Sequence, residues 1–301
     1  MVLNTIAVTG ASGMLGRHLL AALDDAGLGI AATSRSRPGE LPEAAKWASW
    51  DLLDWKTPDQ LDRIFGDVDA VIHAGAIVPR PGQDASIEAL FKANVEASLA
   101  LGSWAMARKL PFLYISGAVV YADPSAPGIT ETAATSPVGF GGYYKTTKLL
   151  AEQALRGLTD LGLGLCILRP SSIYGSGLPK GKMISDFLAA ASRDEVIQLQ
   201  PPADDRINLV HAGDVAGAAI SALSTHAGGI FNVSGPRLVS IEEIARACVV
   251  SAGRGKIVID NARSSRPPTS RFDLDISHAA AAFGYAPKID IAAGLEILTR
   301  Q

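Results

Sequence analysis

Short apolar runs alternate, in the first half of the chain, with segments whose leucines recur every three or four residues. The apolar runs cover residues 6–8, 29–33, 47–52, 69–76 and 112–115. Runs of this length predict buried strands, and the wider leucine spacing, as in 15–23, predicts amphipathic helices packed on them. The alternation predicts an α/β fold with a doubly wound parallel sheet covered by helices on both faces.

The pattern changes after residue 170, where short elements are separated by Gly and Pro. This change predicts two domains, a dinucleotide-binding domain over 1–170 and a smaller C-terminal α/β substrate domain over 171–301, with some later elements returning to the first. Within the second domain, Asp214 is expected to be the N-cap of a helix.

Three glycines lie where the first apolar run passes into the first leucine segment, in the stretch TGASGMLG at 9–16. Gly10 would allow a tight turn, Gly13 a close approach of backbone to a pyrophosphate, and Gly16 close packing of helix on strand. The amides and the positive dipole end of the helix would face the phosphates. We predict a Rossmann-type dinucleotide site, with a plain glycine-rich turn as the alternative. The first residues predicted to contact the dinucleotide are Gly10, Ser12, Gly13, Met14, Leu15 and Gly16.

The end of the second apolar run bears on which dinucleotide would bind. An acidic residue at this strand tip would bind the 2′-hydroxyl of the adenosine ribose. The tip instead reads Ser34-Arg35-Ser36-Arg37, with no carboxylate before Glu40. Guanidinium and hydroxyl groups suit a 2′-phosphate, so NADP is predicted, with contacts from Ser34, Arg35 and Arg37. NAD is the less favoured cofactor, and a solvated basic loop is the alternative.

Further cofactor contacts are expected near the next two strand ends. Asp51 could accept a hydrogen bond from the adenine amino group or could cap the following turn. Asn94, in the helical segment 86–108, could reach a neighbouring strand or helix near the site, whereas His73 is interpreted as a core histidine. Small residues that would let the cofactor lie close to the fourth strand are Ala74, Gly75 and Ala76.

Tyr144 and Lys148 open a helix and are four residues apart, so their side chains lie on one face. A nearby ammonium and an oxidised nicotinamide would lower the pKa of the phenol, so that Tyr144 could exchange a proton with a reacting oxygen. Ser116, at the tip of the fifth strand, could hold the same oxygen. We predict these three residues as the catalytic set, and Tyr144 and Lys148 also as cofactor contacts; a surface pair is the alternative.

Composition narrows the function classes. The net charge of −3 gives no general attraction to nucleic acid or to an anionic membrane. No apolar run approaches the roughly 20 residues of a membrane span. The two cysteines, Cys166 and Cys248, do not have the spacing of metal ligands, so no metal site is predicted. A reducing cytoplasm is the expected compartment.

These features together resemble the extended short-chain dehydrogenase/reductases, in the NAD-dependent epimerase/dehydratase branch, over nearly the whole chain. The motifs that carry the resemblance are TGASGMLG, Asp51-Leu52, 71–76, Asn94-Val95, 116–121, 144–148, Leu168-Arg169-Pro170, Tyr174-Gly175 and 206–216. The resemblance implies a Rossmann domain, a Ser/Thr–Tyr–Lys catalytic set, a small-molecule substrate and a homodimer formed through 86–108 and 144–158. It also implies a cofactor contact from Leu52. The substrate contacts that it implies are Ser116, Gly117, Tyr174, Arg206 and Arg266.

The two arginines match family positions that meet a substrate diphosphate, and each could instead be a structural ion-pair partner. Other positions depart from the sugar-nucleotide pattern. Gly117 stands where those members carry the catalytic hydroxyl, and Ser172 where an Asn is common. Ser116, five residues before Tyr121, has the spacing of the dihydroflavonol and cinnamoyl-CoA reductase branch. Dehydration is not expected, because the Thr-Asp-Glu set of sugar dehydratases would fall on 117–119.

Three functions stay open from the sequence. The leading one is an NAD(P)-dependent oxidoreductase or epimerase that interconverts a carbonyl and a secondary alcohol on a nucleotide sugar. The second is an NADPH-dependent reductase of a small ketone or aldehyde. The third, of another class, is a non-catalytic NADP-binding sensor.

Overall fold

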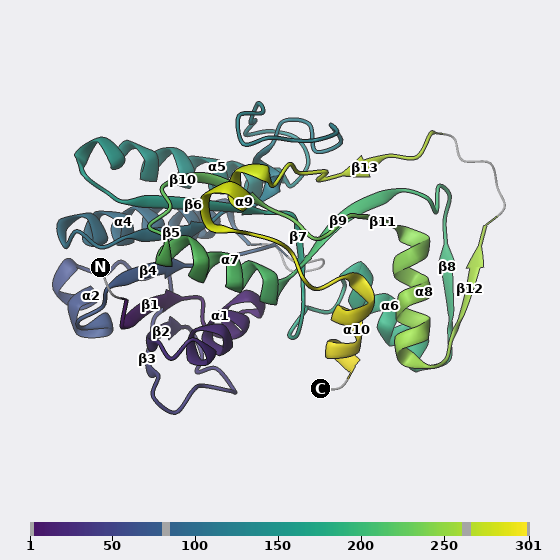
Figure 1. Cartoon of the computed structure of the whole chain (residues 1–301), viewed down its shortest axis with the longest axis horizontal. Coiled ribbons are helices and arrows are strands. Elements are labelled where there is room, and N and C mark those ends of the chain that lie inside the picture. The colour runs from purple at the N-terminus through teal and green to yellow at the C-terminus, as the bar shows by residue number, and fades with distance from the viewer. Residues whose placement is uncertain (1–2, 80–84, 261–265, 300–301) are drawn as a thin grey trace.

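The architecture is dominated by one large parallel sheet (Figure 1). A computed structural model of the chain describes residues 3–79, 85–260 and 266–299. In spatial order, the seven strands of the sheet are β10 (Gly229–Val233), β6 (Leu165–Pro170), β5 (Phe112–Ile115), β4 (Ala70–His73), β1 (Thr5–Thr9), β2 (Gly29–Ser34) and β3 (Lys46–Ser49). Every neighbouring pair is parallel. The predicted doubly wound sheet is confirmed.

Helices cover both faces of this sheet, which explains why its strands are continuous apolar runs. One face carries α1 (Met14–Asp25), α7 (Ala212–Ser224) and α9 (Ser277–Phe283); the other carries α2 (Pro58–Phe65), α4 (Ala97–Ala107) and α5 (Gly142–Gly157). Successive residues of β1 alternate between the two cores, since Ile6 and Val8 pack into one and Ala7 into the other. The central strand β1 therefore needs apolar side chains on both of its faces.

The predicted helix over 86–108 is divided in three. It consists of α3 (Ile87–Phe91), a π-helical turn over Lys92–Glu96, and α4. Such turns widen a helix locally and often occur at functional sites. Asn94 lies in this turn and is buried, so the widened backbone carries its amide inward.

Most of the remaining strands and helices form the right-hand part of the molecule in Figure 1. A small sheet joins β9 (Arg206–His211) to β7 (Ser172–Tyr174), β11 (Leu238–Ser240) and β13 (Ser270–Arg271), and β8 (Val196–Leu199) pairs with β12 (Lys256–Ile259). The helices here are α6 (Met183–Ser192), α8 (Ile241–Ala252) and α10 (Ile291–Thr299). Short 3₁₀ turns occur at Ala118–Val120 and Thr159–Leu161.

The expectation that Asp214 is an N-cap is wrong. His211 is the N-cap of α7, because its Nδ1 accepts the backbone N–H of Gly213 at 3.1 Å. The carboxylate of Asp214 instead accepts the backbone N–H groups of Lys288 and Ile289 at 3.1 and 3.0 Å. It therefore fastens the C-terminal segment to the first turn of α7.

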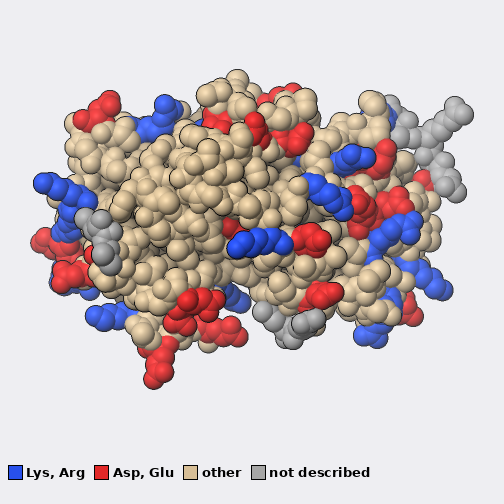
Figure 2. Space-filling model, viewed as in Figure 1, with Lys and Arg blue, Asp and Glu red and all other residues tan. Residues whose placement is uncertain are grey.

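Acidic and basic side chains are interspersed on the face shown in Figure 2, in keeping with the small net charge of −3. Within the part of the chain that the structure describes, no helix combines the length and the apolar character of a membrane span. Both cysteines are buried thiols.

Replacing Gly16 by Ala should destabilise the fold by about 1–3 kcal/mol, as expected for overpacking. A Cβ there would lie 2.1 Å from the carbonyl oxygen of Gly10 and 2.7 Å from the Cα of Ala11, and backbone cannot yield as a flexible side chain does. Chemical denaturation measures the loss. Gly157→Ala, in the last turn of α5 with nothing within 4 Å of its added Cβ, is the matched control and should gain slightly in helix propensity. Equal stability of the two variants would contradict this interpretation.

Candidate active site

The glycine turn has the geometry that a dinucleotide phosphate requires. Gly10 has φ +73° and packs against Gly75, so closely that an added Cβ would lie 2.7 Å from the Gly75 Cα. Gly13 is the N-cap of α1 and offers no side-chain cap, which leaves the first-turn amides open to a ligand. The residues present therefore fit a bound pyrophosphate at this helix terminus.

A chain of hydrogen bonds holds the two strand ends beside this turn. Thr9 Oγ1 lies 2.6 Å from His73 Nδ1 and accepts the backbone N–H of Gly75 at 3.1 Å. His73 Nε2 lies 2.9 Å from Ser98 Oγ, which donates to the carbonyl of Asn94. Burial, together with the charge of Lys148, lowers the pKa of His73 to about 3. His73 is thus a neutral core histidine, as expected from the sequence.

The side chain of Asn94 connects the loop after β4 to the start of α5. Its Oδ1 accepts the N–H of Ile77 at 2.7 Å, and its Nδ2 donates to the Ile77 carbonyl and to Thr147 Oγ1, both at 3.0 Å. Thr147 in turn donates to the carbonyl of Tyr144. Both amide protons of Asn94 are used within the chain, so its side chain fastens the loop after β4 to α5. Its contact with the cofactor stays a prediction.

The tip of β2 carries two cationic side chains. Arg35 and Arg37 are exposed. The hydroxyl of Ser34 is buried, donates to the carbonyl of Ser36 and accepts from Trp47 Nε1 at 3.0 Å. A 2′-phosphate would therefore be met by the arginines, while Ser34 shapes the turn.

Asp51 and the small residues after β4 lie near this tip. One carboxylate oxygen of Asp51 accepts the N–H of Leu53 at 3.1 Å, which is the turn-capping alternative. The side chain of Leu52 packs against Gly75, at 3.0 Å from an added Cβ. Ala74 and Ala76 flank Gly75, where any larger residue would intrude on the glycine turn.

Lys148 and Ser116 lie together at the C-terminal edge of the large sheet, and Tyr144 lies on the same helix as Lys148. Lys148 is 3% exposed, donates to the Ile115 carbonyl at 2.7 Å and lies over the ring of Tyr114 at 4.5 Å. Ser116, directly after Ile115, is 5% exposed, and its Oγ has no hydrogen-bond partner among the described residues. Tyr144 lies one turn before Lys148 on α5 and is half-buried.

The protonation states differ from the expectation for Tyr144. Burial raises its pKa to about 12, whereas burial lowers the pKa of Lys148 to about 7, against the opposing effect of Glu152. In the chain alone, burial sets the direction of the Tyr144 pKa, and Lys148 directs its ammonium to the Ile115 carbonyl. The lowering of that pKa by the ammonium together with an oxidised nicotinamide stays a prediction. A protonated phenol suits the donation of a proton to a carbonyl oxygen.

Lys145 is a buried residue that the sequence did not single out. It is fully buried in the first turns of α5, and its Nζ donates to the carbonyl of Tyr121 at 2.8 Å. Burial lowers its pKa. The nearby glycines are the feature of the sequence that could have indicated this burial. Gly139 and Gly141 both have positive φ, and their lack of side chains lets the loop lie close to Lys145.

The predicted substrate contacts are in different situations. Arg206 is exposed on β9, whereas Gly117 is partly buried, with Val119 and Pro170 at ordinary contact distance from an added Cβ. Arg266 forms a two-point ion pair with Asp205, which is the structural alternative left open above. Tyr174 is 1% exposed, and its hydroxyl donates to the Asp290 carbonyl at 2.9 Å, so it is a core residue.

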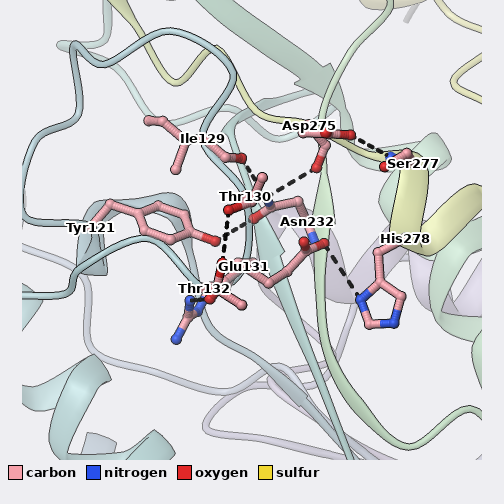
Figure 3. Close-up of polar contacts among 10 residues, drawn as sticks. Tyr121, Ile129, Thr130, Glu131, Thr132, Asn232, Asp275, Ser277 and His278 are labelled. Carbon is pink, nitrogen blue, oxygen red and sulfur yellow. Dashed lines mark hydrogen bonds and ion pairs between the residues drawn. The ribbon is translucent and has the colours of Figure 1, made fainter.

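A polar network anchors the long loop that leads from Tyr121 to Tyr144 (Figure 3). Tyr121 donates to Asn232 Oδ1 at 2.6 Å, and Asn232 Nδ2 donates to the carbonyls of Ile129 and Asp275. The backbone N–H of Asn232 donates to Glu131 Oε1 at 2.8 Å. The loop is thereby fixed to β10, at the edge of the sheet.

Comparison with known proteins agrees with this geometry. The model of the NAD dependent epimerase/dehydratase family matches residues 6–234. Among solved structures, the chain is similar to the UDP-N-acetylglucosamine 4-epimerase of Bacillus cereus, at 22% identity and a TM-score of 0.83 over 99% of this chain and 96% of that one. It is also similar to the UDP-glucose 4-epimerase of Thermotoga maritima, solved with UDP-glucose, at 20% identity and a TM-score of 0.82 over 98% of each chain.

A third similar structure is the UDP-glucuronic acid 4-epimerase of Bacillus cereus in complex with NAD, at 22% identity and a TM-score of 0.81 over 98% of this chain and 97% of that one. At such identities the likeness extends to the fold, while the family match covers most of the chain and agrees with a nicotinamide cofactor. The chain is an enzyme of the extended short-chain dehydrogenase/reductase type and belongs to the NAD-dependent epimerase/dehydratase family.

Proposed function

We propose that this enzyme interconverts a carbonyl and a secondary alcohol, with Tyr144 as the acid–base residue. The observation that carries the proposal is the buried Oγ of Ser116, which has no partner among the described residues and follows the carbonyl that holds Lys148. A substrate oxygen would fill that gap in hydrogen bonding. The nicotinamide, when bound, supplies or accepts the hydride at the adjacent carbon.

Each residue has a separate part in this proposal. Tyr144 would donate its phenolic proton to the carbonyl oxygen or take it from the alcohol. Ser116 would orient that oxygen. Lys148, fixed by the Ile115 carbonyl, would supply the positive charge that favours the phenolate once the proton has left.

We propose a nucleotide sugar as the substrate. Structural neighbours are described as UDP-sugar 4-epimerases, and exposed Arg206 is available for a diphosphate. The ion pair of Arg266 with Asp205 and the position of Ser116 favour a second candidate, a small ketone or aldehyde. That substrate would need no diphosphate site.

Calorimetric titration of the NADP-loaded enzyme with UDP, dTDP, GDP and CDP tests the substrate class. Binding of one nucleoside diphosphate at micromolar concentration, lost in Arg206→Ala, is expected. Arg246→Ala, which removes an exposed arginine paired with Glu242 on α8, is the control and should bind as the wild type does. Absence of binding by all four nucleotides would contradict the nucleotide sugar and favour the small carbonyl substrate.

We propose NADP as the preferred cofactor, on the ground that Arg35 and Arg37 are exposed at the tip of β2. Arg35→Ala should weaken NADP binding about 10-fold, the worth of one charge-assisted hydrogen bond, and leave NAD binding unchanged. Fluorescence titration with both dinucleotides measures this, with Arg63→Ala on α2 as a control. Equal weakening of NADP and NAD would contradict a 2′-phosphate contact.

We also propose that the protein forms a homodimer and that it works in a reducing cytoplasm. We place the boundary between its two domains near residue 170. Leu99 on α4 and Leu150 on α5 are 37% and 40% exposed, as a shared helical interface would require. Both cysteines are reduced and buried. Analytical ultracentrifugation tests the dimer by measuring the mass in solution. The wild type is expected to be a dimer, and a variant with charged residues at 99 and 150 is expected to be a monomer.

A further inference from the structure

Three buried polar atoms lie where the C-terminal part of the chain crosses helix α1. They are Nε2 of His18, Nε2 of His211 and Oγ of Ser176, and none has a hydrogen-bond partner among the described residues. His211 is 1% exposed, and its ring lies edge-on to that of His18, with centroids 5.1 Å apart. Unpartnered buried polar atoms are uncommon and costly, so three on neighbouring residues call for an explanation.

The bonds of the other ring nitrogens define which of these atoms donate. His211 Nδ1 accepts the N–H of Gly213, so neutral His211 carries its proton on Nε2, which is a donor. His18 makes a hydrogen bond to the backbone of Ser176. Because Nε2 of His18 has no partner among the described residues, we assign this bond to Nδ1, which donates to the Ser176 carbonyl. Nε2 of neutral His18 is then an acceptor. Burial and the neighbouring His211 lower the pKa of His18 to about 4, so it is neutral near pH 7.

One donor, one acceptor and one hydroxyl match a single water molecule, which can make two to four hydrogen bonds in a buried polar site. A metal ion fits poorly, because it needs a lone pair on each ring. His211 cannot offer one at Nε2 while its Nδ1 accepts from Gly213.

The segment that carries Ser176 lies directly on the first turns of α1. A Cβ added at Gly175 would lie 2.9 Å from His18 Nε2, and one at Gly177 would lie 3.4 Å from Arg17 Nη1 and 3.8 Å from the Met14 Cα. A turn bond from Leu178 N–H to the Gly175 carbonyl closes the segment at 3.0 Å. Residues 175–178 therefore cross α1 beside the amides that would meet the pyrophosphate.

We propose that a water molecule bound by His18, His211 and Ser176 completes a latch that holds residues 175–178 across the first turn of α1. The three side chains are then positioning residues for the pyrophosphate half of the cofactor. This positioning role rests on the proposed cofactor site, whereas the latch depends only on the contacts among His18, His211 and residues 175–178.

Hydrogen exchange of the cofactor-free protein tests the latch by itself. His18→Phe and Ser176→Ala should each speed the exchange of amides 176–178 about 5- to 10-fold, as expected for the loss of one buried hydrogen bond. Ser224→Ala, at the exposed end of α7, is the matched control and should change nothing there. Unchanged exchange in both latch variants would overturn the proposal.

Binding constants test the positioning role. His18→Phe should weaken the full dinucleotide about 5- to 10-fold and leave AMP, which lacks the pyrophosphate and nicotinamide, unchanged. His18→Asn, whose amide replaces the Nδ1–H donor, should recover part of the loss. Equal weakening of both ligands, or of neither, would overturn this role. If the wild type binds AMP and no dinucleotide, the proposed function fails, while hydrogen exchange still decides on the latch.

A high-resolution crystal structure of the cofactor-free enzyme tests the water itself. Density within about 3 Å of all three polar atoms is expected. A metal ion there, or no density between the side chains, would overturn the bridging water.

Discussion

Replacing Tyr144 by Phe is expected to lower kcat/KM by about 10²–10⁴-fold, the usual contribution of a positioned acid–base group. The change removes one oxygen and leaves the bond of Lys148 to the Ile115 carbonyl in place. Because burial keeps the phenol protonated, with its pKa raised to about 12, the change removes the proposed proton donor. Steady-state rates, with dinucleotide binding measured alongside, check the result.

Tyr143→Phe is the matched control for this prediction. Tyr143 is the neighbouring residue in the first turn of α5 and is also half-buried, so the two variants make the same chemical change one residue apart. The control should retain most of the wild-type activity. Full activity of Tyr144→Phe would remove Tyr144 as the acid–base residue, and a wild type that binds dinucleotide without turnover of any carbonyl would favour the non-catalytic sensor.

The second large effect is expected on stability, from Glu152→Ala. Glu152 and Arg169 form a fully buried ion pair, with side chains 0% and 3% exposed and two bonds of 3.1 and 2.6 Å. Burial alone would lower the pKa of Arg169, yet the bond to Glu152 raises it above its ordinary value. Removal of the carboxylate leaves a buried guanidinium without its counter-charge, which should cost about 3–5 kcal/mol.

Chemical denaturation of Glu152→Ala measures this cost. Glu195→Ala is the matched control, because Glu195 makes a similar two-point pair with Arg193 that is exposed to solvent. Its loss should be about 0–1 kcal/mol. A double variant with apolar residues at 152 and 169 should be more stable than Glu152→Ala, because no charge is then left buried. Similar losses in the two single variants would contradict the role of burial.

The sheet was predictable because its strands are buried on both faces. The strand over 112–115 was predicted with the bounds that the structure has, and the alternation of β1 between two cores explains why the whole run is apolar. The role of Gly16 was predictable for a local reason, because it is constrained by Gly10 and Ala11 in its own turn. Gly10 packs against Gly75, which follows the neighbouring strand β4, and its role was predictable from the spacing of the glycine motif.

Features that depend on distant partners could not be predicted. The π turn in 86–108 forms around Asn94, whose partners Ile77 and Thr147 belong to other elements. The role of Arg266 depends on Asp205, 61 residues away.

Charged and polar residues in unexpected surroundings were missed for a related reason. The burial of Lys145 depends on a loop folded over it, which hydrophobic spacing does not report. His211 replaces Asp214 as the helix cap because a ring nitrogen meets the Gly213 amide. The latch residue His18 likewise shows no signal in the sequence, since its partners arrive from residues 175–178 and from the end of β9.

The most direct test of the proposed chemistry is the absorbance of reduced nicotinamide in single-turnover mixing. Enzyme loaded with oxidised cofactor is mixed with a panel of UDP-, dTDP-, GDP- and CDP-sugars and with small secondary alcohols. We expect the absorbance band of reduced cofactor to appear with at least one of them, lasting if the enzyme is a dehydrogenase and transient if it is an epimerase. If the cofactor and a panel compound both bind and no reduced nicotinamide forms at any time, hydride transfer at this site is contradicted.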